Sequence, residues 1–313
     1  MPTTYSPLRY PGGKSQLTPF IVELLRENNL LDGTYVEPFA GGAGIAWHLL
    51  LKGFVQEVYI NDLNPSIYAF WKAVLEENDK LCGLIEDTPI TIDEWNKQKL
   101  VQHSSNTASL ELGFSTLFLN RTNRSGIIKA GVIGGKSQDG NYKLDCRFQK
   151  QAIIKKIQDI HLFKDEIKLF NLDANDFIRD ILPSVEQKSL INIDPPYYIK
   201  GKGLYQNFFE HKDHQSLLNS IETIHHPWIV TYDNTPEINS LYAKHNPKTF
   251  ELNYSAQKKC KGSEVIIYGP GIQACQFEPG MTFSQVKNLK KTLSDNMIMK
   301  KTKQERYEYD EVV

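Results

Sequence analysis

Residues 34–50, TYVEPFAGGAGIAWHLL, decide the fold of this chain. A short run rich in β-forming residues leads into Gly41, Gly42 and Gly44, and an apolar stretch with helical character follows. Glycines at a strand-to-helix turn let a ligand approach the backbone close to a helix N-terminus. The stretch therefore predicts a strand, a ligand-binding turn and a helix, although any tight connection of this kind also carries glycines.

Working outward, short apolar runs bounded by polar or turn residues predict strands at 34–40, 57–61, 167–171, 189–193, 227–232 and 264–269. Helix-like stretches lie near 43–52, 65–79, 148–160, 174–182 and 212–224. Strands that alternate with helices are typical of a parallel sheet covered on both faces. The prediction is a doubly wound α/β fold.

The alternation is interrupted between the second and third predicted strands, where residues 110–120, LELGFSTLFLN, have helical character. We expect 1–79 and 166–280 to form a discontinuous sheet domain, 80–165 a mainly helical insertion and 281–313 a polar tail. Within the insertion, residues 121–156 hold nine basic and two acidic residues. This basic segment is either a solvated face or a binding surface for an anionic partner.

Bulk properties narrow the class of protein. Of the 313 residues, 40% are hydrophobic and 23% charged, as in a soluble globular protein. The chain lacks a long apolar run and its start lacks a secretory signal, so a cytoplasmic location without a membrane partner is expected. A net charge of −1 means that any nucleic acid must bind through a local patch. Four widely spaced cysteines suggest neither a zinc site nor disulfides, and we expect no metal.

The string INIDPPYY places Asp194, Pro195, Pro196 and Tyr197 directly after a predicted strand, at the sheet edge where α/β proteins bind ligands. The amino group of adenine is a poor nucleophile, because its lone pair is delocalised into the ring. Asp194 can accept one N–H of such an amine, and the carbonyl of Pro195, held rigid by Pro196, can accept the other. Two fixed acceptors favour the tetrahedral nitrogen that attacks a sulfonium methyl group.

Tyr197 adds a ring that can stack on a flat base, a contact worth about 1 to 3 kcal/mol. The alternative is a proline-rich turn in which Asp194 caps the turn and Tyr197 packs in the core. Asp62 follows the next strand, where doubly wound folds place an acid on ribose hydroxyls, and alone it could equally cap a helix. Glu37, before the glycines, suits an uncharged or cationic ligand better than a pyrophosphate.

These motifs resemble the DNA adenine methylase (Dam-like) family, in the alpha group of amino-methyltransferases. The resemblance spans most of the chain and rests on RYPGGK (9–14), EPFAGGAG (37–44), Asp62, NDF (175–177), DPPY (194–197) and the later YDN segment. It implies S-adenosylmethionine as cofactor, base flipping and direct transfer of a methyl group to the N6 atom of adenine in double-stranded DNA. The residues that it implies at the cofactor are Tyr10, Lys14, Glu37, Phe39, Gly41, Gly42, Gly44, Asp62, Asp176 and Phe177.

The family carries more specific roles onto this sequence. Lys14 would pair with the cofactor carboxylate, Asp62 would bind the ribose, and Asp176 would accept from the cofactor's adenine, with Phe177 beside that ring. The segment FLNRTNRSGIIKAGVIGGK resembles the family's target-recognition region, so DNA contacts are expected from Asn120, Arg121, Arg124, Lys129 and Lys136. Because Arg121 is followed by TNRSGI, the pattern of the GATC-specific members is not kept and the target sequence stays open.

Three alternatives remain at this stage: an RNA adenine methyltransferase, an amino-cytosine DNA methyltransferase and a catalytically silent DNA-binding protein. The chain has no Pro-Cys step, which disfavours enzymes that methylate the cytosine ring through a cysteine nucleophile. The biological setting is equally open. A partner of a restriction endonuclease in restriction-modification, a solitary methylase and a phage enzyme all fit the sequence.

Overall fold

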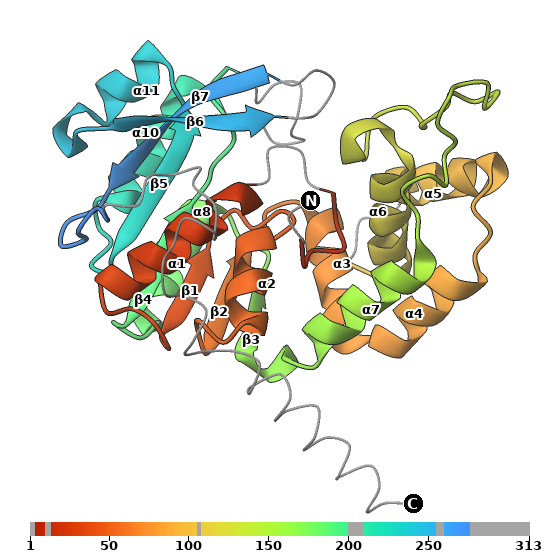
Figure 1. Cartoon of the computed structure of the whole chain (residues 1–313), viewed down its shortest axis with the longest axis horizontal. Helices are drawn as coiled ribbons and strands as arrows, with labels where there is room; N and C mark the ends of the chain where they lie inside the picture. The colour runs from red at the N-terminus through yellow and green to blue at the C-terminus, as the bar shows by residue number, and fades with distance from the viewer. Residues whose placement is uncertain (1–3, 10–13, 105–107, 200–208, 255–259, 276–313) are drawn as a thin grey trace, which may run out of the picture.

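The computed structural model describes residues 4–9, 14–104, 108–199, 209–254 and 260–275. Its centre is a seven-stranded sheet with strand order β3-β2-β1-β4-β5-β7-β6 (Figure 1). The strands are β1 (Thr34–Glu37), β2 (Glu57–Asn61), β3 (Ile167–Phe170), β4 (Ser189–Ile193), β5 (Trp228–Asp233), β6 (Lys248–Tyr254) and β7 (Cys260–Tyr268). The order runs outward from β1 in both directions, which confirms the doubly wound α/β fold.

The sheet is parallel as expected except at one edge. β7 pairs antiparallel with both β5 and β6, whereas β1 to β5 pair in parallel. No strand was predicted for the residues of β6, and β7 begins earlier than expected. The five residues between β6 and β7 explain the direction, because a parallel connection needs a crossover of a dozen or more residues.

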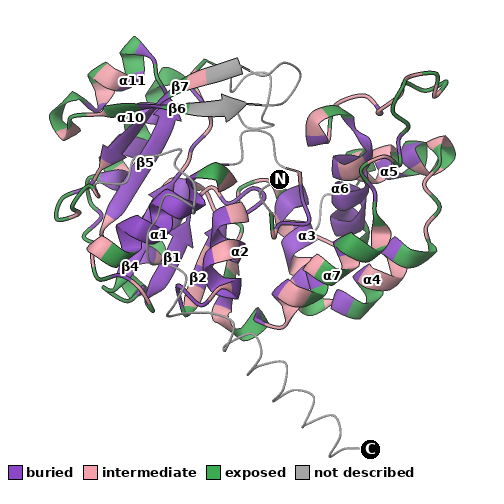
Figure 2. Ribbon diagram, viewed as in Figure 1, coloured by how far each residue is buried: buried purple, intermediate pink, exposed green. Residues whose placement is uncertain are grey.

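Alternate strand residues enter two apolar clusters, one on each face of the sheet. Tyr35, Leu190 and Ile229 pack with helices α1 (Thr18–Glu27) and α2 (Gly44–Leu51). Val36, Ile191 and Val230 pack with helices α8 (Ala174–Asp180), α10 (His211–Ile221) and α11 (Pro236–Leu241). Because side chains alternate between the two faces of a strand, each strand contributes to both clusters, and the central strands β1 and β5 are purple in Figure 2. α1 and α11 were not predicted, although each begins with Thr or Pro at a helix start.

Between β2 and β3 the chain forms a group of helices that Figure 1 shows to one side of the sheet. They are α3 (Pro65–Glu76), α4 (Asn78–Asp87), α5 (Ile92–Ser104), α6 (Leu110–Thr122) and α7 (Lys150–His161). α6 packs against α3 and α5, and α4 packs against α7. A Cβ atom at Gly113 of α6 would lie 2.6 Å from the carbonyl oxygen of Ala69, so only glycine allows this close packing on α3.

Short 3-10 helices complete the described part of the chain: η1 (Ser15–Leu17), η2 (Arg124–Gly126), η3 (Lys164–Glu166), η4 (Leu182–Ser184) and η5 (Ala243–His245). None of the helices in the described ranges is long and apolar enough to cross a membrane.

Candidate active site

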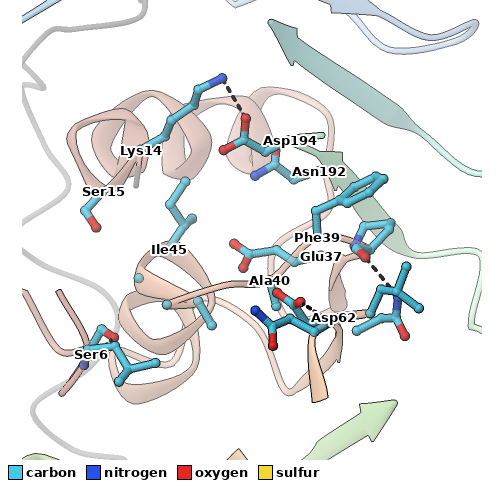
Figure 3. Close-up of a pocket in the computed structure, with 18 of the residues that line it drawn as sticks. Ser6, Lys14, Ser15, Glu37, Phe39, Ala40, Ile45, Asp62, Asn192 and Asp194 are labelled. Atoms are coloured by element: carbon cyan, nitrogen blue, oxygen red, sulfur yellow. Dashed lines mark hydrogen bonds and ion pairs between the residues drawn. The ribbon is translucent and has the colours of Figure 1, made fainter. Parts of the chain in front are cut away.

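A cavity of about 350 Å³ opens at the carboxyl ends of β1, β2 and β4. The strand order reverses between β1 and β4, and open α/β sheets bind ligands at such a point. Figure 3 shows Lys14 and Asp194 at one side of this cavity, Asp62 at another and Ser6 at a third. The cavity therefore joins the glycine-rich turn, the DPPY segment and the N-terminal segment of residues 4–9.

The glycine-rich turn forms one wall. Gly41 and Ala43 have positive φ angles of 48° and 46°, a conformation that lets β1 turn sharply into α2. Gly42, Ala43 and Gly44 line the cavity, and a Cβ atom at Gly44 would lie 2.3 Å from the Ser15 hydroxyl oxygen. The turn thus needs glycine at position 44 to pack against η1.

Asp62 is fixed by two backbone donors. The amide of Gly41 donates to its Oδ2 atom at 2.8 Å and the amide of Asn64 to its Oδ1 atom at 2.9 Å. Burial raises the pKa of the Asp62 carboxyl to about 6, against the two hydrogen bonds. Since each carboxylate oxygen can accept more than one hydrogen bond, Asp62 can still receive two hydroxyl groups of a ligand.

Glu37 ends β1 and is buried below the turn. Burial raises the pKa of its carboxyl to about 8, and the nearby Asp194 adds to this rise. Glu37 and Phe39 both line the cavity, and the Phe39 ring meets Phe209 edge-on at 6.0 Å between ring centroids. Glu37 therefore gives this wall a carboxyl whose charged form a nearby cation would favour.

Asp194 belongs to a buried cluster of charges at the end of β4. The Lys14 ammonium lies 2.7 Å from its Oδ1 atom and 3.1 Å from the Oε2 atom of Glu264 on β7. Thr231 donates to the same Oδ1 atom at 3.3 Å. Burial opposes the charge on Lys14, but the two carboxylates outweigh it and its pKa is raised. Burial also raises the pKa of both carboxyls, while Lys14 opposes that rise.

Of the other three residues of the DPPY segment, one lines the cavity and two are buried outside its described lining. Pro196 lines it, Pro195 is buried, and Tyr197 is only 3% exposed. The Tyr197 hydroxyl donates to Glu264 at 2.6 Å, and its ring centroid lies 5.1 Å from the Lys14 ammonium nitrogen. Tyr197 is not among the described residues that line the cavity, so its stacking on a base stays a prediction.

Cations gather at the end of the cavity near Ser6. Arg9, Arg121 and Lys156 line it there, and the described part of the chain gives none of them an acidic partner. Arg121 donates to the carbonyl of Pro7, and Lys156 to that of Ser6 at 3.3 Å. Burial, with help from Arg9, lowers the pKa of Arg121 to about 10. Burial and then Arg121 lower the pKa of Lys156. An anion would relieve this repulsion.

Two residues predicted at the cofactor lie on helix α8. Asp176 is half-exposed and its carboxylate meets Arg179 at 2.7 Å, and Phe177 is packed in the core against Phe170. Asp173 and Ala174 line the cavity instead, because they sit where the chain leaves the sheet and α8 begins. Asp176 and Phe177 are not among the described residues that line this cavity, and their contact with a cofactor stays a prediction.

The residues predicted to contact DNA divide into two groups. Asn120 is 2% exposed and bonded to the chain itself: it accepts from the Arg9 amide and donates to the carbonyls of Arg9 and Gly126. With these atoms engaged, Asn120 fixes the N-terminal segment, and Arg121 beside it faces the cavity. Arg124, Lys129 and Lys136 are exposed, as a DNA contact requires.

Tyr10 lies outside the described residues. Of the residues that sequence analysis missed, Asp173, Lys156 and Glu264 carry charge at or beside the cavity. Within the described ranges no group of three His, Cys, Asp or Glu side chains could hold a metal ion.

Comparison with known proteins shows which family the chain matches. The model of the D12 class N6 adenine-specific DNA methyltransferases matches residues 10–257. The chain is 25% identical over 207 residues to the type II methyltransferase M.MjaIII of Methanocaldococcus jannaschii, covering 61% of this chain and 68% of that protein.

Similar solved structures are more distant. TrmK of M. capricolum, in complex with S-adenosylhomocysteine, aligns with a TM-score of 0.34 at 8% identity, over 78% of this chain and 66% of that one. The rRNA methyltransferase AviRa of Streptomyces viridochromogenes aligns with a TM-score of 0.36 at 13% identity, over 83% of this chain and 86% of that one.

Proposed function

We propose, because the chain belongs to the D12 class of N6 adenine-specific DNA methyltransferases, that it methylates adenine at one specific DNA sequence after flipping the base toward Asp194. As a member of this family it is a DNA adenine methyltransferase whose methyl donor is S-adenosylmethionine. The observation that carries the proposal is the cavity in which Asp194 lies beside the glycine-rich turn.

The cavity lining fits this donor. A ribose offers hydroxyl hydrogens, which the Asp62 carboxylate can accept, and a sulfonium favours the acidic wall that Glu37 and Asp194 provide. The Arg121 and Lys156 end provides cations for a carboxylate. When bound, S-adenosylmethionine supplies an electrophilic methyl group.

Asp194 is the group proposed to act on the amine. Its described contacts with Lys14 and Thr231 both fall on Oδ1, so Oδ2 can accept an N–H of the target base. The Pro195 carbonyl accepts the second N–H. Transfer places a positive charge on the amino nitrogen, and the adjacent Asp194 carboxylate stabilises that charge before a proton is lost to solvent.

We further propose that Arg121 and Lys156 receive the carboxylate of the methyl donor, a role first expected of Lys14. The Lys14 ammonium is already engaged by two carboxylates, whereas Lys156 meets only a carbonyl and repelling cations. Lys156→Met is expected to weaken binding of S-adenosylhomocysteine about tenfold, or ~1.4 kcal/mol.

A calorimetric titration checks this expectation. Methylthioadenosine lacks the carboxylate and should bind the variant and the wild type equally. The matched control is Lys155→Met, because Lys155 is exposed and paired with Asp159. Equal weakening of both ligands by Lys156→Met would speak for damage to the cavity rather than removal of an ion pair.

For target recognition we propose residues 80–165, whose exposed Arg124, Lys129 and Lys136 contact DNA. Replacing Arg124 and Lys129 by Ala is expected to weaken binding of all duplexes, because contacts to phosphates carry no sequence information. The slope of log affinity against log salt should fall by about one for each phosphate that the variant no longer neutralises. Fluorescence anisotropy at several salt concentrations measures this slope. Lys212→Ala, at an exposed lysine of α10 outside residues 80–165, is the control, and an unchanged slope in the Arg124 and Lys129 variant would contradict the assignment.

Two experiments test the proposed function as a whole. A duplex with 2-aminopurine at the target position should brighten on binding if the base leaves the stack. Sequencing with modification detection, on DNA from cells with and without this gene, should reveal methyladenine at one recurrent sequence. Methyladenine scattered without a shared sequence would contradict site specificity. A host endonuclease blocked by the same mark would identify a restriction-modification role.

A further inference from the structure

We propose that Glu264, on the antiparallel strand β7, is a positioning residue for methyl transfer that holds both Lys14 and Tyr197 in place around Asp194. The inference rests on the proposed function, in which Asp194 contacts the target base. Glu264 itself is not among the described residues that line the cavity, and it need not touch the base.

The two oxygens of Glu264 have separate tasks. Oε1 accepts the Tyr197 hydroxyl at 2.6 Å, and Oε2 lies 3.1 Å from the Lys14 ammonium. Lys14 in turn contacts Asp194 at 2.7 Å. One carboxylate on β7 thus links the acceptor and the aromatic ring of the segment that follows β4.

A buried charged group without a partner is rare, because its removal from water is costly. The Glu264 side chain is 1% exposed, and the next three residues of β7, Val265, Ile266 and Ile267, are apolar and buried. An apolar residue at position 264 would continue that pattern. A carboxylate is required only by the two donors that it meets.

The neighbouring strand supports the same segment in a second way. Asp233 on β5 is paired in register with Glu264, and its carboxylate accepts the backbone amides of Tyr198 and Ile199 at 2.8 and 3.0 Å. Asp233 therefore fixes the backbone after the DPPY motif, while Glu264 fixes the Tyr197 side chain. Adjacent acids on two strands hold consecutive residues.

The charges around Glu264 predict how the pH dependence of methyl transfer changes when Glu264 is replaced. Among the described residues, the charged or titratable groups that face it are Lys14, Asp194, Tyr197 and the register partner Asp233, while β6 presents Phe250. Asp194 and Glu264 share one ammonium, and the charge of Asp194 raises the pKa of Glu264. Because two like charges repel each other mutually, the titrations of the two carboxyls are coupled. If the Glu264 carboxylate is removed, Asp194 faces the Lys14 ammonium alone, so Asp194 must take up its proton at a lower pH.

The test is Glu264→Gln in the full-length enzyme, with the single-turnover rate of methyl transfer measured from about pH 5 to about pH 9. We expect a rate lower by about 10- to 100-fold, with the Kd for S-adenosylmethionine within about threefold of wild type. The acidic limb of the pH–rate profile should move to lower pH. Glu237→Gln, on exposed α11, is the matched control and should leave rate and profile unchanged.

Tyr197→Phe should move the acidic limb of the pH–rate profile in the direction opposite to that expected for Glu264→Gln. It keeps the ring and removes the donor that lowers the pKa of Glu264, so the acidic limb should move to higher pH. If Glu264→Gln does not fold, as judged by thermal melting, this variant decides alone. An unmoved limb in Tyr197→Phe would then overturn the inference.

The remaining outcomes are separable. A slower Glu264→Gln with an unmoved acidic limb shows a merely structural role, and an unchanged rate shows no role at all; both overturn the inference. Absence of transfer to DNA adenine by the wild type in the same assay would instead contradict the proposed function.

Discussion

Asp194→Asn is expected to lower the single-turnover rate of adenine methylation by about 10²- to 10³-fold, the usual effect of removing one group that stabilises transition-state charge. Asn keeps the shape of Asp194, but it cannot balance the charge that develops on the amino nitrogen. Rapid-quench kinetics with labelled S-adenosylmethionine measure the rate.

Binding of the donor should change little in this variant, because Asp62 and the Arg121 end of the cavity are untouched. Calorimetry on the same preparations separates binding from chemistry, and Asp87→Asn, on the exposed end of α4, is the control. A variant that transfers methyl groups at the wild-type rate would remove Asp194 from the mechanism.

Lys14→Met is expected to destabilise the folded protein by about 3 kcal/mol, since it leaves the buried carboxylate of Glu264 and the partly buried carboxylate of Asp194 without their cation. Urea denaturation measures the change in the free energy of unfolding. Lys80→Met, at an exposed pair with Glu77 on α4, should change stability by less than about 1 kcal/mol.

The pH dependence of this variant follows from the direction of the shifts. Burial raises the pKa of both carboxyls above their unfolded values, and without Lys14 the rise is larger. A group with a raised pKa in the folded state takes up a proton on folding, so stability is gained at low pH and lost as pH rises through the folded value. The difference in the free energy of unfolding between Lys14→Met and the wild type should therefore become smaller at lower pH. A difference that stays constant with pH would argue against a coupled cluster.

Much of the fold follows from periodicity. The runs at 57–61 and 189–193 became β2 and β4 with the predicted bounds, because each is a short apolar run that ends sharply at polar or turn residues. The family resemblance is confirmed by the family match over residues 10–257. The direction of β7 depends on its pairing with β6, which sequence analysis missed although the alternation of polar and apolar residues in KTFELNY is typical of a half-buried strand.

The site was predicted less completely, for physical reasons. In NLDANDF two aspartates lie three residues apart, and only the position of the helix start decides which faces the cavity. Asp173 caps α8 at the sheet edge, whereas Asp176 lies in its first turn and is half-exposed. Glu264 is 67 residues from Tyr197 in sequence, so only the β5–β7 pairing brings it there.

The most direct test of the whole account is the chemical position of the transferred methyl group. Purified enzyme, labelled S-adenosylmethionine and unmodified duplex DNA should yield label only in N6-methyladenine after digestion to nucleosides, and Asp194→Ala should yield none. Label in cytosine, or in RNA but not DNA, would contradict the account.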